Sequence, residues 1–190
     1  AKELASLDVV SNGRLIFGIG VGYLKPEFDA LGIPFDHKGT RTEDYLRAML
    51  AIWTQDEPRH EGRFTSFSGV QAFPRPLQKP HPEIVFGGHT PEAFRRAIAH
   101  ASGWYGFFQD VDGTKRCIDG LREAARAAGR PGGLDGFEIS VTPPPGLDLD
   151  TARRFADLGV HRLIPFQLGG DAQAQLDFVK HTADTLIGRV

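Results

Sequence analysis

The segment Leu15-Ile16-Phe17-Gly18-Ile19-Gly20-Val21-Gly22 joins an unbroken apolar run to glycines at alternate positions. An apolar run without polar alternation is typical of a parallel β-strand that is covered on both faces. Four later segments have the same character, and together with Leu15–Gly20 they predict five strands: Glu83–Gly87, Trp104–Phe108, Phe137–Thr142 and Arg162–Gln167.

A helix is predicted after each strand, because the residues that follow carry helix start and stop signals. Thr40-x-x-Glu43 is a capping-box pattern, and Thr90-Pro91-Glu92 combines an N-cap hydroxyl with a proline and an acid in the first turn. The predicted helices are one near the start with Leu4 and Leu7 on one face, then Thr40–Trp53, one that begins at Thr90, Asp112–Gly129, Asp150–Gly159 and Asp171–Gly188. The last helix is expected to bury Leu176, Val179, Ala183 and Leu186.

This alternation of strand and helix predicts an α/β fold whose parallel sheet has right-handed crossovers. An open doubly wound sheet and a (β/α)8 barrel both fit, although five units are too few to close an eight-stranded barrel. The first unit differs from the others, because Tyr23–Gly39 and Thr54–Pro82 are predicted to be long loops on either side of one helix. Loops of this length in a compact domain are usually functional.

Length and composition indicate one globular domain, residues 1–190. The net charge of −2, with mixed signs along the chain, offers no basic surface for nucleic acid, and no apolar run approaches the roughly 20 residues that span a bilayer. Cys117 is the only cysteine, so a reducing, cytoplasmic setting is expected. The chain begins at Ala1 inside a helical pattern, and we therefore interpret it as a cut chain or an incomplete gene product.

The alternate glycines leave two interpretations open. They would let a flat ring or a phosphate approach the backbone, or they would simply let a neighbouring strand pack closely. A dinucleotide fingerprint needs a third glycine three residues after the second. That position is Tyr23 in one frame and Lys25 in the other, and Lys25 is followed by Pro26, which is hostile to a helix. The sequence therefore does not predict a Rossmann nucleotide loop.

A second glycine motif, Gly87-Gly88-His89-Thr90-Pro91, ends a predicted strand and begins a helix within three residues. Free N–H groups and the positive end of the helix dipole would converge there and favour a phosphate, with a plain tight turn as the alternative. The aromatic strand Ser102–Phe107 would either wall a planar cofactor or fill the core. The histidines have no metal-ligand spacing, so no metal site is predicted.

The string Leu7-Asp8-x-x-Ser11-x-Gly13-Arg14-Leu15-x-x-Gly18-x-Gly20-x-Gly22 resembles the fourth-strand region of the luciferase-like family. Members of this family are flavin- or deazaflavin-dependent oxidoreductases on a (β/α)8 barrel. Similar motifs follow in the family's order: Glu27-Phe28-x-Ala30-x-Gly32, Arg41-x-x-Glu43, Trp53-Thr54, Glu61-Gly62-x-Phe64, Pro74-x-Pro76-x-Gln78-x-Pro80, Gly87-Gly88 and Gly103-Trp104. The resemblance implies an incomplete (β/α)8 barrel of five strand–helix units, strands four to eight, in which residues 1–190 are the C-terminal part of the barrel domain.

By this resemblance, the parent enzyme transfers a hydride between coenzyme F420 and an organic small-molecule substrate. The Trp-Thr, Pro-x-Pro-x-Gln and Gly-Gly patterns are similar to the F420-dependent branch. The alternatives are an FMN-dependent monooxygenase and a truncated, non-catalytic flavin-binding protein; a nicotinamide-dependent Rossmann enzyme is a third idea. No catalytic residue is assigned, because the family's candidates would lie in the three strand–helix units that precede this region.

The resemblance also assigns cofactor-binding residues. One side of the cofactor's ring pocket would be lined by Gly20, Gly22, Tyr23 and Glu27. The phosphate of the cofactor's side chain would be bound by Gly87, Gly88, His89 and Thr90. Trp104 would lie at the floor or wall of the ring pocket. A homodimer is expected, and neither nucleic acid nor a membrane is expected as a partner.

Overall fold

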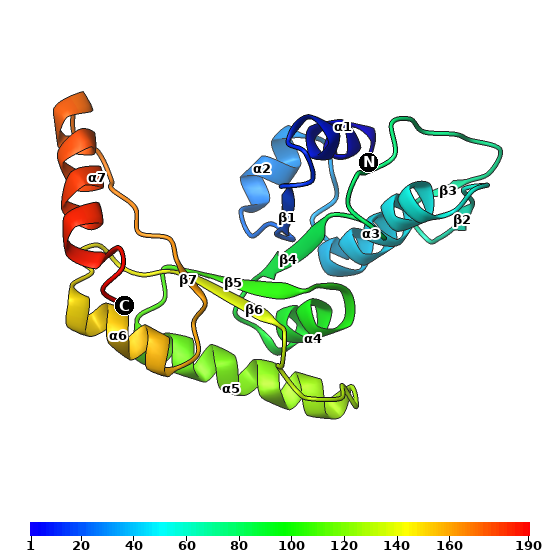
Figure 1. Ribbon diagram of the computed structural model, residues 1–190. Helices are drawn as coiled ribbons and strands as arrows, with labels where there is room; N and C mark the ends of the chain where they lie inside the picture. Colours follow the sequence, from blue (N-terminus) through cyan, green and yellow to red (C-terminus); the bar gives the residue numbers. More distant parts are fainter. The chain divides into compact units, whose positions relative to one another are not determined.

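The computed structural model describes all 190 residues, which group into two compact units, Ala1–Ile84 and Val85–Val190. Figure 1 labels their elements in chain order. The first unit holds α1 (Lys2–Val10), β1 (Ile16–Ile19), α2 (Lys25–Ala30), α3 (Lys38–Thr54), β2 (His60–Glu61), β3 (Ser66–Phe67) and the first residues of β4 (Glu83–Gly87). The second unit holds the rest of β4, α4 (Pro91–His100), β5 (Gly103–Phe107), α5 (Val111–Ala127), β6 (Glu138–Thr142), α6 (Leu149–Asp157), β7 (Arg162–Leu163) and α7 (Ala172–Leu186).

Five strands form the main sheet in the order β1-β4-β5-β6-β7, as the strand–helix alternation predicts. The pairs β4–β5, β5–β6 and β6–β7 are parallel, and their register aligns Phe86 with Trp104 and Trp104 with Ile139. The five strands form an open sheet, as expected of an incomplete barrel. The separate two-stranded sheet is an antiparallel hairpin, β2–β3, inside the segment predicted to be a loop.

The first unit departs from the sequence-based expectations at three helices. In α1 the buried residues are Ala5 and Asp8, whereas Leu7 is 54% exposed, so the predicted apolar face is wrong. The second departure is helix α2, which lies inside Tyr23–Gly39, a segment predicted to be a loop. Pro26 stands in the first turn of this helix. Proline is tolerated there because the first-turn N–H groups have no intrahelical acceptor.

Helix α3 begins at Lys38, two residues before the predicted capping box. Its N-cap is His37, which has a φ of +60° and makes no side-chain cap. Thr40 is already inside the first turn, and its hydroxyl donates to the His37 carbonyl at 3.0 Å. The capping-box prediction is therefore wrong at this helix.

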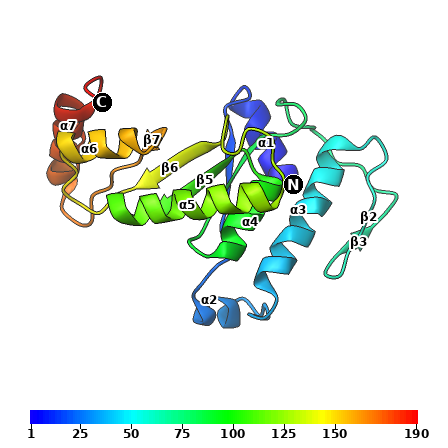
Figure 2. The same cartoon turned by 90° about the horizontal axis from the view of Figure 1, so that it is seen from below.

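In the second unit, α4 and α5 lie side by side (Figures 1 and 2). The predicted cap Thr90 is confirmed, since its side chain accepts the amide N–H of Ala93 at 3.3 Å. Asp171, predicted only as the start of the last helix, is the N-cap of α7 and accepts the amide N–H of Ala174 at 2.9 Å. At α6 the cap is Asp148 and not Asp150, because the helix begins one residue before Asp150.

The end of the chain is less regular than its sequence predicts. Strand β7 has only two residues, and α7 has no fully buried residue. Leu176, Val179 and Ala183, which were expected to face inward, are exposed, and Leu186, expected there too, is only half-buried. Phe178, which was not expected to face inward, is half-buried as well. None of the helices is long and apolar enough to cross a bilayer.

Candidate functional site

The β4–α4 turn, residues 87–90, has a backbone that requires glycine. Gly88 has a φ of +116°, and a Cβ added there would lie 2.7 Å from the Cβ of Ala93. A side chain at position 88 would therefore meet both strain and a steric clash. Gly87, just before it, is the last residue of β4 and pairs with Tyr105. The turn thus brings backbone, rather than side chains, to the N-terminus of α4.

Unused hydrogen-bond donors gather at this turn. The amide of Ala93 is bonded to the Thr90 hydroxyl, and the amide of Phe94 to the Thr90 carbonyl at 3.0 Å. The amides of His89 and Thr90 have no acceptor in the structure. These two N–H groups lie at the positive end of the α4 dipole, where an anion is favoured.

One carboxylate of the chain already lies at this helix terminus. The N–H of Glu92 itself, and then the hydroxyl of Thr90, hold the pKa of the Glu92 carboxyl below its usual range. Glu92 is therefore ionised at neutral pH, and its charge partly occupies the position that a bound anion would use.

Trp104 connects the turn to the core. Its side chain is 0% exposed, and its indole N–H donates to the carbonyl of Gly88 at 2.8 Å. Its ring contacts the ring of His89, with centroids 6.2 Å apart and near-perpendicular planes. Partial burial lowers the pKa of His89, which favours its neutral imidazole. The structure thus places Trp104, which was expected at the ring pocket, against Gly88 and His89, two of the residues expected at the phosphate.

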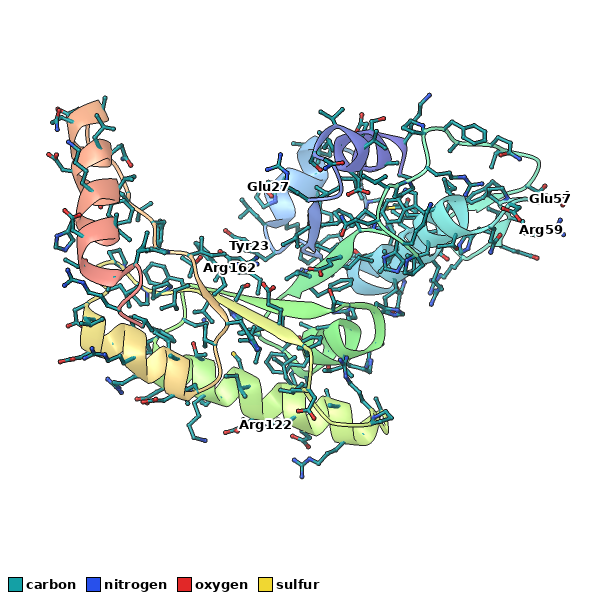
Figure 3. All side chains as sticks on the ribbon, viewed as in Figure 1. Tyr23, Glu27, Glu57, Arg59, Arg122 and Arg162 are labelled. Carbon is teal, nitrogen blue, oxygen red and sulfur yellow. The ribbon has the colours of Figure 1, made fainter.

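The residues expected on the ring side belong to the first unit. Gly20 follows the end of β1, and no atom lies within 4 Å of a Cβ added there. Gly22 has a φ of +77°, and an added Cβ would lie 2.6 Å from the ring of Phe28. Tyr23 is 87% exposed, and Glu27 is an exposed residue of the first turn of α2 (Figure 3). Gly20 therefore borders open space, whereas Gly22 allows close packing of α2.

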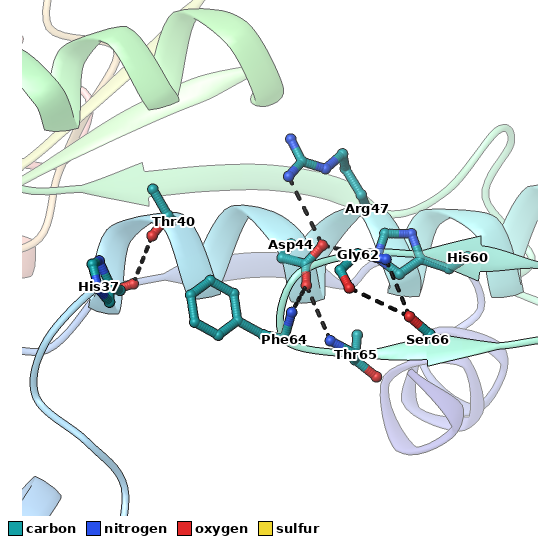
Figure 4. Close-up of polar contacts among 9 residues, drawn as sticks. All are labelled: His37, Thr40, Asp44, Arg47, His60, Gly62, Phe64, Thr65 and Ser66. Carbon is teal, nitrogen blue, oxygen red and sulfur yellow. Dashed lines mark hydrogen bonds and ion pairs between the residues drawn. The ribbon is translucent and has the colours of Figure 1, made fainter.

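A polar cluster around Asp44 was missed by sequence reasoning (Figure 4). The buried Asp44 carboxylate accepts the amides of Phe64 at 2.8 Å and Thr65 at 3.2 Å, and lies 2.9 Å from His60 Nε2. Burial raises the pKa of Asp44, but these hydrogen bonds and His60 outweigh it, so the pKa is lowered overall. The cluster attaches the β2–β3 hairpin to α3. The partners lie 16 to 21 residues from Asp44, and no local signal reports such a contact.

Three phenylalanines cluster at the carboxyl ends of β5 and β7, which is the end that binds ligands in barrels of this type. Phe107, Phe108 and Phe166 have ring centroids 6.0 Å apart in each pair. Phe107 and Phe108 are exposed, and Phe108 has a φ of +54°. The sequence indicates an aromatic strand that ends at Phe107. It does not predict that Phe166 joins this cluster, because that contact depends on how the strands pair.

Comparison with known proteins decides the family. The profile described as luciferase-like monooxygenase matches residues 1–179, almost the whole chain. The chain belongs to this family. This chain is 33% identical over 180 residues to an uncharacterized protein of Mycobacterium tuberculosis, and the match covers 93% of this chain and 62% of the relative. It therefore spans less than two thirds of that relative's length.

Three further proteins are similar to this chain in sequence or in fold. An FMNH2-dependent dimethylsulfone monooxygenase of Pseudomonas putida is 38% identical over 135 residues, which covers 68% of this chain and 36% of that protein. Among solved structures, the coenzyme F420-dependent tetrahydromethanopterin reductase of Methanopyrus kandleri aligns with a TM-score of 0.78 at 15% identity, over 97% of this chain and 76% of that one. Monooxygenase RslO1 of Streptomyces bottropensis aligns with a TM-score of 0.63 at 27% identity, over 98% and 53%. These structures establish the luciferase-like barrel as the fold to which the five-stranded sheet corresponds.

Proposed function

We propose that the chain provides the phosphate-binding turn and part of the ring pocket of an oxidoreductase that transfers a hydride between coenzyme F420 and an organic small-molecule substrate. The observation that carries the proposal is the β4–α4 turn. Two amides without an acceptor, those of His89 and Thr90, lie there at the positive end of α4. The positive φ and close packing of Gly88 keep side chains away from the bound group.

The β4–α4 turn fits a cofactor that carries a phosphate. The amides of His89 and Thr90 would hold the phosphate. Gly20, Gly22, Tyr23 and Glu27 remain proposed neighbours of the cofactor's ring. When bound, the deazaflavin would supply the hydride chemistry, while the chain would bind and orient it and exclude water from the reacting face. No residue of this chain is proposed as the catalytic acid or base.

FMN is the second candidate cofactor, in a monooxygenase that acts with the reduced flavin. The observation that favours it is the 38% identity to the dimethylsulfone monooxygenase. A phosphate-bearing side chain is common to both cofactors, so the β4–α4 turn suits either. F420 is placed first because of three motifs: Trp53-Thr54, Pro74-x-Pro76-x-Gln78 and Gly87-Gly88.

The proposal extends to a homodimer in the cytoplasm. The single cysteine, Cys117, supports a reducing compartment: it is buried in α5, and burial raises the pKa of its thiol, which stays protonated and inert.

The experiment that tests the proposal is a fluorescence titration of the protein with F420, FMN and NADH. Tighter binding of F420 than of FMN is expected, with no binding of NADH. Exclusive binding of FMN would select the second candidate. Exclusive binding of NADH, or binding of none of the three, would contradict the proposal as a whole.

A further inference from the structure

Trp104 is held rigidly beneath the β4–α4 turn. Its ring packs edge-on against Phe94 of α4, with centroids 6.2 Å apart. Gly106, two residues along β5, leaves room for the indole, because a Cβ added there would lie 2.4 Å from Trp104 Cη2. Gly120 of α5 leaves room for Phe94 in the same way, with an added Cβ 2.5 Å from that ring. Close packing on both sides therefore fixes the direction in which the indole N–H points.

The acceptor of that N–H belongs to the peptide group that joins Gly88 to His89. This bond is trans, since the cis bonds of the structure are Phe73-Pro74 and Lys79-Pro80. In a planar trans peptide group the C=O and the N–H point in opposite directions. A Gly88 carbonyl held against the buried Trp104 therefore turns the His89 N–H away from the core. This is one of the two amides that have no acceptor in the structure.

We infer that Trp104 is a positioning residue for phosphate binding: it orients the Gly88–His89 peptide group so that the His89 amide faces an anion at the N-terminus of α4. The inference rests on the proposed function, because it takes the anion to be the cofactor's phosphate. Trp104 acts through Gly88 and does not touch the ligand, in contrast to the ring-pocket position that the family resemblance implies. A donor that is already oriented spares the bound state the cost of ordering it.

The test removes the indole donor and keeps the shape of the ring. Trp104 is replaced by 3-benzothienylalanine, in which sulfur stands in place of the N–H, and Trp104→Phe serves as a second variant. Trp53 is the matched control, because its indole N–H also donates to a main-chain carbonyl, that of Ala1, at 3.1 Å. Thermal unfolding followed by circular dichroism establishes that each variant is folded.

Two ligand pairs isolate the contribution of the phosphate: FMN with riboflavin, and F420 with its phosphate-free deazaflavin. The dissociation constants within each pair are measured by fluorescence, and their ratio is compared between variants. The change at Trp104 is expected to lower the phosphate-dependent ratio about threefold to tenfold, as the loss of one hydrogen bond predicts. Binding of the phosphate-free ligand is expected to stay unchanged, and the change at Trp53 is expected to leave the ratio unaltered.

Two results overturn the inference. One is an unchanged ratio in a folded Trp104 variant. The other is an equal loss of affinity for both members of a pair, which would place Trp104 beside the ring. A wild-type protein that binds neither pair overturns the proposed function itself, and the inference with it.

Discussion

Glu92 sets the charge that a phosphate would meet at the N-terminus of α4. Its own N–H, followed by the Thr90 hydroxyl, lowers the pKa of its carboxyl, so a negative charge persists at the helix terminus at neutral pH. We predict that Glu92→Gln tightens the binding of FMN or F420 about threefold, because one like charge is removed from the first turn. Titrations at low ionic strength measure the change, which should shrink as salt is added.

Glu123→Gln is the control for this prediction. Glu123 is an exposed residue of α5, so its replacement changes the net charge by the same amount on another helix. An equal gain of affinity in both variants would mean that only the overall charge matters. Unchanged affinity in Glu92→Gln would mean that the carboxylate does not compete with the ligand.

At the scale of elements, the packing of α4 against α5 depends on Gly120. Replacing a glycine inside a helix with alanine usually stabilises the helix by up to about 1 kcal/mol. Here the added Cβ would lie 2.5 Å from the ring of Phe94, which is buried. We therefore predict that Gly120→Ala destabilises the protein by about 1–3 kcal/mol, as overpacking does. Urea unfolding of the single variant measures this cost.

A double-mutant cycle tests the assigned cause. Phe94→Leu shortens the side chain that the new methyl group meets, so the double variant should cost less than the sum of the two single changes. Strict additivity would show that Gly120 and Phe94 do not meet in the way described.

The β2–β3 hairpin depends on Asp44 in α3. Asp44→Ala would leave the amides of Phe64 and Thr65 without their acceptor in a half-buried position. We predict a loss of about 2–4 kcal/mol of stability, since each buried donor left unpaired costs about 1–3 kcal/mol. Hydrogen exchange should speed up at these two amides first. Asp36→Ala, at an exposed aspartate of the same unit, should change neither stability nor exchange, and an equal loss there would contradict the role given to Asp44.

At the scale of the whole molecule, acid should act on the two units unequally. The first unit holds both fully buried carboxylates, Asp8 and Asp44. Burial raises the pKa of Asp8, but the hydrogen bonds from Gln78 and the neighbouring backbone outweigh it and lower the pKa overall. In the second unit, the lowered carboxyl pKa values of Asp119 and Asp148 belong to exposed groups.

A carboxyl whose pKa is lower in the folded state stabilises the fold at every pH above its unfolded pKa, about 4. That contribution is lost as the pH falls through the folded pKa. We therefore predict that pepsin, applied at pH values from about 4 down to about 2, cuts within residues 1–84 before it cuts within 85–190, as mapped by mass spectrometry. The double variant Asp8→Asn, Asp44→Asn should lose the pH dependence of this order. First cleavage within the second unit would contradict the prediction.

The features that could be predicted from the sequence are those that depend on neighbouring residues. Thr90 is recognisable as an N-cap because a cap depends on residues within three positions of it, and its hydroxyl accepts the expected amide of Ala93. The sequence places the start of α3 at Thr40, but the helix begins at Lys38. The reason is that the N-cap residue, His37, adopts a positive φ, and the residue types near Thr40 do not indicate this. The hydrogen bond from Gln78 to Asp8 joins residues 70 positions apart. Each residue belongs to a recognisable motif, but no local pattern in the sequence predicts that the two are in contact.

By itself, the sequence determined the α/β alternation, the five strands, the glycine turn before α4 and the family, because each of these depends on periodicity or on short motifs. Only the tertiary structure decided which side of the sheet receives Trp104 and which carboxylates are buried. A one-residue step along a strand moves a side chain to the opposite face, and burial depends on segments far away in the chain. For this reason the structure, and not the sequence, places the indole of Trp104 against the carbonyl of Gly88.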